Sequence, residues 1–150
     1  MALVRRQWEL SRGMKFSGLE EAALAVHEDL ISWMRKAADI SSSERARLGF
    51  YLTSYGVDLM GAKRYDDAYD TQTEGITLLR ALMSAGEDCA SVLVSALQLH
   101  AQLAALSGDR PAQRSRLEEA LTVIDSAGAA DWVDEARTEI QAKLDAADNA

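Results

Sequence analysis

Apolar residues recur along almost the whole chain at spacings of three and four residues, and strict alternation of apolar and polar residues is almost absent. This period is typical of amphipathic α-helices and not of β-strands. The apolar stripes predict helices over about 18–39, 44–61, 65–86 and 89–107. Tyr65 and Leu106 belong to the stripes of the last two helices. The stripe of the first contains Leu19, Ala23, Val26, Leu30, Trp33 and Ala37.

Short polar segments separate these helices and supply their caps. The serines at 41–43 offer an N-cap for the helix that follows, and Asp109 is expected to cap the next-to-last one. A last helix is predicted at 131–148, and a short first one at 2–12. The pattern therefore predicts an all-α fold of about seven helices, in a single domain over 1–150.

The chain also repeats itself. Residues 74–79 (EGITLL) reappear 45 positions later as residues 119–124 (EALTVI). One period earlier, residues 19–22 (LEEA) match residues 65–68 (YDDA) at a shift of 46. Each period holds two helices and a turn. Because such a unit buries its apolar face only against a neighbour, the periods are expected to stack on a shared core.

Two segments of the repeat carry a pattern of apolar and small residues. They read Leu52-x-x-Tyr55-Gly56-x-x-Leu59 with Tyr65-Asp66-Asp67-Ala68-x-x-x-Gln72-x-x-Gly75, and Leu97-x-x-His100-Ala101-x-x-Ala104 with Leu117-x-x-Ala120. This pattern resembles the tetratricopeptide repeat family, in an extended-period form found in bacteria. Gly56, Ala68 and Gly75 fall where that family needs close helix contact. The resemblance implies antiparallel helix hairpins in a right-handed superhelix, with a degenerate repeat at 1–40, repeats at 44–86 and 89–128, and a capping helix at 131–148.

In that family the first helix of each pair lines a concave face on which peptides dock. The resemblance implies a groove lined by Phe50, Thr53, Ser54, Val57 and Met60 from one repeat and by Ser95, Gln98, Leu99, Gln102 and Ala105 from the next. Such a mixture of apolar anchors, amides and hydroxyls suits a bound peptide. The expected function is a non-catalytic protein- or peptide-binding module, a scaffold or adaptor, without metal or cofactor. A regulator that senses a signalling peptide or other ligand is the first alternative.

A small helical enzyme is the second alternative, and it rests on an acidic run. Asp66, Asp67 and Asp70 spell DDxxD, which resembles the magnesium–diphosphate motif of terpene and prenyl synthases. Two carboxylates four residues apart on one helical face can hold Mg²⁺. That family also needs a larger helical barrel and a second acidic motif, which this sequence lacks. Acids in the first turn of a helix complement its dipole, and we favour that explanation.

The histidines and the cysteine add no catalytic or metal site. His27 and His100 have no second ligand at metal spacing, and His100 lies on an apolar stripe, so a buried, hydrogen-bonded side chain is expected there. Cys89 is the only cysteine and follows Glu87 and Asp88, which would raise its pKa. We therefore expect Cys89 to be a buried filler at a helix start, in a cytoplasmic protein.

Charge narrows the choice of partners. Lys+Arg number 16 and Asp+Glu 24, and the formal net charge of -8 argues against nucleic acid and anionic membranes. The charge is uneven, with +3 over residues 1–15 and -4 over residues 131–150. This asymmetry leaves open a head-to-tail homo-oligomer. No run of eighteen apolar residues predicts a membrane span, and the excess of Arg over Lys, 12 to 4, favours a bacterial source.

Overall fold

The computed structural model describes residues 20–39 and 41–149. This part of the chain contains no strand and forms α2 (Glu20–Ala38), α3 (Ser42–Gly61), α4 (Tyr65–Ser84), α5 (Ala90–Leu106), α6 (Arg110–Ser126) and α7 (Val133–Asp148). The all-α prediction is confirmed for these residues, and all six described helices lie where the apolar pattern placed them. The helix predicted over 2–12 lies outside the described residues.

The helix boundaries follow local chemistry that the sequence already contains. Ser41 Oγ accepts a hydrogen bond from the backbone N–H of Glu44 at 3.2 Å, which caps α3. Asp109 Oδ1 accepts from the N–H of Ala112 at 3.0 Å, which caps α6. After α5 the chain turns at Gly108, whose φ of 77° is a conformation that L side chains rarely adopt.

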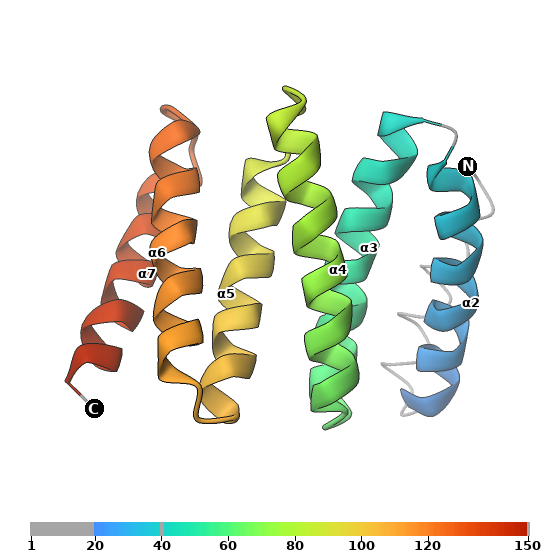
Figure 1. The fold of residues 1–150 in the computed structure, drawn as a ribbon, viewed down its shortest axis with the longest axis horizontal. Coiled ribbons are helices and arrows are strands. Elements are labelled where there is room, and N and C mark those ends of the chain that lie inside the picture. Colours follow the sequence, from blue (N-terminus) through green and yellow to red (C-terminus); the bar gives the residue numbers. More distant parts are fainter. Residues whose placement is uncertain (1–19, 40, 150) are drawn as a thin grey trace.

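The helices form two layers of antiparallel neighbours (Figure 1). Helix α3 packs most extensively against α4, and α5 against α6, so these are the two complete hairpins. Helices α2, α4 and α6 form one layer, and α3, α5 and α7 lie behind it (Figure 1). Helix α5 also contacts α3 and α4. It is therefore enclosed by neighbours, as its broad apolar surface predicted.

The hydrophobic core runs continuously from α2 to α7. One cluster of buried residues joins α2 to α5 and a second joins α4 to α7, and the half-buried Leu78 packs against both. The contact between α3 and α4 is close. A Cβ on Gly56 would lie 2.4 Å from Nε2 of Gln72, and one on Gly75 would lie 3.3 Å from Cβ of Leu52. The small residues are therefore what allows α3 and α4 to approach this closely.

Two interhelical ion pairs give the register of the repeat. Arg35 of α2 pairs with Glu74 of α4, and Arg80 of α4 pairs with Glu119 of α6, each at 2.6 Å. Both members of the second pair lie 45 residues after those of the first. Buried residues agree with this shift: Ala23, His27, Leu30, Ile31 and Met34 of α2 correspond to Ala68, Gln72, Gly75, Ile76 and Leu79 of α4.

The shift of 46 inferred between the first and second periods is therefore wrong by one residue. That alignment matched Glu20 and Glu21 with Asp66 and Asp67, which are exposed in the first turns of their helices. Exposed acids tolerate displacement along a helix. Buried side chains do not, because one residue rotates a position by about 100° around the helix axis.

Trp33 also departs from its expected place. The sequence pattern placed it in the core stripe of α2, yet it is 46% exposed. The buried stripe of α2 runs instead through Leu24, Ile31 and Met34. Leu78 and Val123, which lie 45 and 90 residues after Trp33, are half-buried and buried. Trp33 therefore occupies a position that is covered in the later repeats.

Candidate functional site

The ten residues of the expected groove lie on α3 and α5, at positions that correspond through the 45-residue shift. Figure 1 shows these two helices in the same layer of the fold. The residues that are open to solvent are Phe50, Val57, Ser95, Gln102 and Ala105. Those that are half-buried are Ser54, Met60, Gln98 and Leu99. Nine of the ten thus present some surface on one side of the paired helices.

Thr53 is the exception, because it is 7% exposed. Its hydroxyl donates to the carbonyl of Gly49 at 3.0 Å, and its own carbonyl accepts from Nε2 of Gln72 at 3.0 Å. The first bond lies within α3, and the second joins α4 to α3. Its side chain is therefore engaged inside the structure and does not offer a hydroxyl to a ligand.

Gln98 has a partner that sequence reasoning missed. Its Oε1 accepts from Nζ of Lys143 on α7 at 2.7 Å, and the same ammonium also lies 2.7 Å from Oε1 of Glu139. Helix α7, expected only as a cap, therefore places a cation beside the groove residues of α5. Only the packing of α7 against the stack brings these two residues together, since they lie 45 positions apart.

The apolar part of this surface lies on α3. Phe50 is 46% exposed and Val57, two turns later, is 36% exposed. The ring of Phe50 meets that of Tyr51 edge to face, with 5.6 Å between centroids. The corresponding positions on α5 are Ser95 and Gln102. The surface therefore changes from apolar on α3 to polar on α5, so its two ends offer different contacts to a partner.

A second surface feature is a hollow of about 460 Å³ between the start of α4 and the end of α5. Its lining consists of Tyr65, Asp66, Tyr69, Leu103, Leu106 and Ser107. Leu106 is 58% exposed and Tyr65 is 43% exposed. Both were expected in buried stripes, which is wrong because each lies in the terminal turn of its helix, where the neighbouring helices no longer cover it. We call this feature the α4–α5 hollow.

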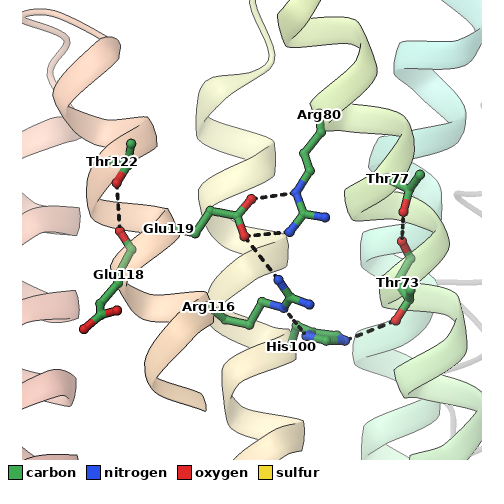
Figure 2. A network of polar contacts seen from close by, with 8 residues as sticks. All are labelled: Thr73, Thr77, Arg80, His100, Arg116, Glu118, Glu119 and Thr122. Carbon is green, nitrogen blue, oxygen red and sulfur yellow. Dashed lines mark hydrogen bonds and ion pairs between the residues drawn. The ribbon is translucent and has the colours of Figure 1, made fainter. Parts of the chain in front are cut away.

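A buried histidine, His100, belongs to a network of polar contacts (Figure 2), and its ring lies against that of Tyr69, which lines the hollow. His100 is 1% exposed, as its place on an apolar stripe predicted. Its Nδ1 accepts from Nε of Arg116 at 3.1 Å, and its Nε2 lies 3.1 Å from Oγ1 of Thr73. That hydroxyl donates to the carbonyl of Tyr69 at 2.9 Å, so it accepts from His100, whose proton therefore sits on Nε2.

Burial and the neighbouring guanidinium groups keep this ring neutral. Burial first, and then the charges of Arg116 and Arg80, lower the pKa of His100 to about 4. Both arginines are held by Glu119, which Arg80 contacts through two bonds of 2.6 Å and Arg116 at 3.3 Å (Figure 2). Burial of Glu119 opposes ionisation, but these arginines together lower the pKa of its carboxyl group.

The acidic run at the start of α4 is exposed. Asp66 and Asp70 face solvent, and Oδ2 of Asp67 accepts from Nε of Arg64 at 2.8 Å. Within the described residues, no group of three or more His, Cys, Asp or Glu side chains is placed to hold a metal ion. Asp66 and Asp67 lie in the first turn of α4, where acids complement the helix dipole, and Asp70 follows in the second turn.

Cys89 is buried at the start of α5, and its thiol donates to the carbonyl of Leu79 at 3.4 Å. Burial first, and then Asp88 and Glu87, raise the pKa of this thiol. The prediction of a buried filler is confirmed. Among the helices described between residues 20 and 149, none combines the length and the apolar character that crossing a membrane requires.

The chain matches no protein-family model, and neither a curated protein nor a solved structure shows significant similarity to it. The residues and their geometry therefore carry the functional argument.

Proposed function

We propose that this chain is a non-catalytic protein- or peptide-binding module, built as a tetratricopeptide-like stack, that binds its partner on the face formed by α3 and α5. The observation that carries the proposal is the exposed pair Phe50 and Val57, which extends along α3 beside the polar groups of α5. Large exposed apolar side chains next to hydrogen-bonding groups are typical of surfaces that bind proteins.

Recurring contacts support the repeat architecture. The phenol of Tyr55 on α3 donates to Oε1 of Glu28 on α2 at 2.9 Å. One period later, Nε2 of His100 on α5 lies 3.1 Å from the hydroxyl of Thr73 on α4. Each pair joins residues 27 positions apart. Together with the arginine–glutamate pairs, these bonds favour a stack in which each period repeats the previous one.

The side chains on this face match the chemistry of a bound peptide. Phe50 and Val57 offer contacts to apolar side chains, while Gln98 and Gln102 carry amides that can bond a peptide backbone. Helices hold all four residues, so binding costs little ordering of the module itself.

The experiment is a selection of random twelve-residue peptides against the immobilised chain, followed by affinity measurement by fluorescence anisotropy. Replacing both Phe50→Ala and Val57→Ala is expected to raise the Kd at least tenfold, because the apolar anchors are lost. Trp33→Ala is the matched control, since it removes an equally exposed aromatic residue from α2 and should leave Kd unchanged. Peptides that bind equally well to both variants would overturn the proposed face.

A further inference from the structure

We propose that the α4–α5 hollow is an anchor site for a partner peptide that carries a bulky apolar side chain next to a lysine or arginine. This inference deepens the proposed function and rests on it, because it names the chemistry of the partner. Three groups of observations carry it: the lining of the hollow, its charge, and its place beside the proposed binding face.

The lining is apolar and open at the same time. Leu106, Tyr65 and Tyr69 are 58%, 43% and 39% exposed, and all three surround one hollow of about 460 Å³. A volume of this size lies in the range of sites that hold a ligand or a large side chain. Leu103, which is buried, forms part of its base. Covering these residues would remove three large, partly apolar side chains from water.

The repeat supplies an internal comparison. A separate hollow of about 440 Å³ lies at the start of α6 and the ends of α5 and α7, and its lining includes Arg110, Gln113 and Lys143. We call it the α6–α7 hollow. Among its lining residues, Arg110 alone corresponds through the shift of 45 to a residue that lines the α4–α5 hollow, which is Tyr65. The equivalent place in the preceding repeat lies between α2 and α3, where five of the six lining residues stand 45 positions before residues of the α4–α5 hollow, and the volume there is only about 70 Å³. An open apolar hollow is therefore a property of the α4–α5 position and not a necessary result of stacking the repeats.

The acidic residues beside the hollow favour a partner with a basic residue. Asp66 lines the hollow and Asp70 lies one turn further along α4, and neither forms an ion pair within residues 20–39 and 41–149. Asp67 differs, because Arg64 already neutralises it. Tyrosine ring faces attract cations, and a nearby carboxylate adds to that attraction. A lysine or arginine beside the inserted apolar side chain therefore meets both kinds of group.

The aromatic side of the hollow is held in place before any ligand arrives. The ring of Tyr69 lies against that of His100, with 4.3 Å between centroids. His100 is fixed in turn by Arg116 and by Thr73, whose hydroxyl also bonds the carbonyl of Tyr69. Because this arrangement is already ordered, little conformational entropy is lost when a ligand covers it.

The hollow continues the proposed binding face. Leu106 follows Gln102 by four residues and Leu99 by seven, so the three side chains lie along one side of α5. Ser107, at the end of α5, also lines the hollow. A peptide that lies along the exposed side of α5 thus reaches the hollow without changing direction, and its anchor residue is its end nearest to α4.

The test uses the same selected peptides, together with variants of the intact chain whose fold is first confirmed by circular dichroism. Leu106→Ser and Tyr65→Ala alter the hollow, and Gln113→Ala is the matched control in the α6–α7 hollow. A fourth variant combines Asp66→Asn with Asp70→Asn. We expect the recovered peptides to share a bulky apolar residue next to Lys or Arg. Leu106→Ser should raise Kd at least tenfold, the aspartate variant about threefold to fivefold with less salt dependence, and Gln113→Ala less than twofold.

The outcomes separate the two proposals. Peptides that lack the apolar–basic pair, or that bind Leu106→Ser as well as the unaltered chain while losing affinity for the Phe50→Ala, Val57→Ala variant, overturn the anchor site and leave the proposed function standing. Recovery of no peptide, or binding that is insensitive to both sets of changes, overturns both.

Discussion

The α4–α5 hollow and the hollow between α2 and α3 occupy equivalent places in successive repeats, but their volumes are about 460 and 70 Å³. Their linings differ, since Leu106 lines the first and Gly61 stands at the equivalent position of the second. In the following repeat, the residues 45 positions after Tyr69 and Leu103 are Arg114 and Asp148, which form an ion pair. The comparison shows that helix packing decides where a hollow forms, while the side chains at its rim decide what it can bind.

The α3–α4 and α5–α6 hairpins differ in their buried polar residues. In the α3–α4 hairpin, Gly56 leaves room for the buried amide of Gln72, which bonds the carbonyl of Thr53. In the α5–α6 hairpin the corresponding residues are Ala101 and Leu117, and both are buried. One repeat thus joins its helices at this level through a hydrogen bond and the other through apolar contact. The backbone arrangement tolerates both because each combination fills the available space.

The largest expected effect tests what the repeats share. Leu52 and Leu97 are equivalent and 0% exposed. Replacing either leucine by alanine should lower the free energy of unfolding by about 4 kcal/mol, because each leaves a cavity in the same continuous core. Urea denaturation of the two variants measures this. A loss that differs by more than about 2 kcal/mol between them would mean that the two hairpins are not equivalently packed.

The next largest effect concerns the pH dependence of stability, which differs between the repeats because His100 stands where the preceding repeat has Tyr55. Protonating His100 opposes folding, because its Nδ1 already accepts from Arg116 inside the structure. Its pKa in the folded chain is about 4, below its ordinary value of 6.5, so the unfolded chain binds the proton at higher pH. The stability that the neutral His100 side chain contributes is complete above pH 6.5, and the free energy of unfolding falls by about 3 kcal/mol as the pH drops to 4.

The measurement is urea denaturation between pH 7.5 and 4 for the unaltered chain and for His100→Gln, whose amide can accept from Arg116 and donate to Thr73. The background from carboxylates is common to both proteins, so the difference between them isolates the histidine. Tyr55, the equivalent residue of the preceding repeat, has a raised pKa and stays neutral over this range. Identical pH profiles for the two proteins would contradict the assignment.

The smallest effect is expected from substitutions that give one repeat the side chains of the other. Gly56→Ala should cost about 1 kcal/mol, because its Cβ would displace the Gln72 amide from the Thr53 carbonyl, and the better helix propensity of alanine offsets part of that loss. Adding Gln72→Leu reproduces the Ala101–Leu117 pair and should recover most of the stability. Gln72→Leu alone is the control. A double variant no more stable than Gly56→Ala would refute the equivalence of the two positions.

The fold was largely predictable from local signals. Ser41 and Asp109 cap their helices as expected, and the described helices lie close to the stripes that predicted them. Part of the surface was not predictable. Trp33 and Leu106 fit apolar stripes in the sequence, yet they are 46% and 58% exposed. A stripe gives the direction of a side chain around its own helix, but not whether another helix covers that direction.

The contacts beside the candidate site were even less accessible to sequence reasoning. The bond between Lys143 and Gln98 joins helices that are separated by the whole of α6. The shift of the first period was misjudged by one residue, since matching acids such as Glu20 and Asp66 are exposed and carry no packing information. Sequence similarity at solvated positions is therefore a weak guide to register.

The sequence by itself determined the all-α character, the helix boundaries and the presence of a repeat, because capping, turns and apolar periodicity act over a few neighbouring residues. Tertiary structure alone decided which apolar side chains stay open, where the α4–α5 hollow forms and which charges meet across helices. The physical reason is that exposure and ion pairing depend on the positions of several helices at once, and those positions are set by the packing of side chains distant in the chain.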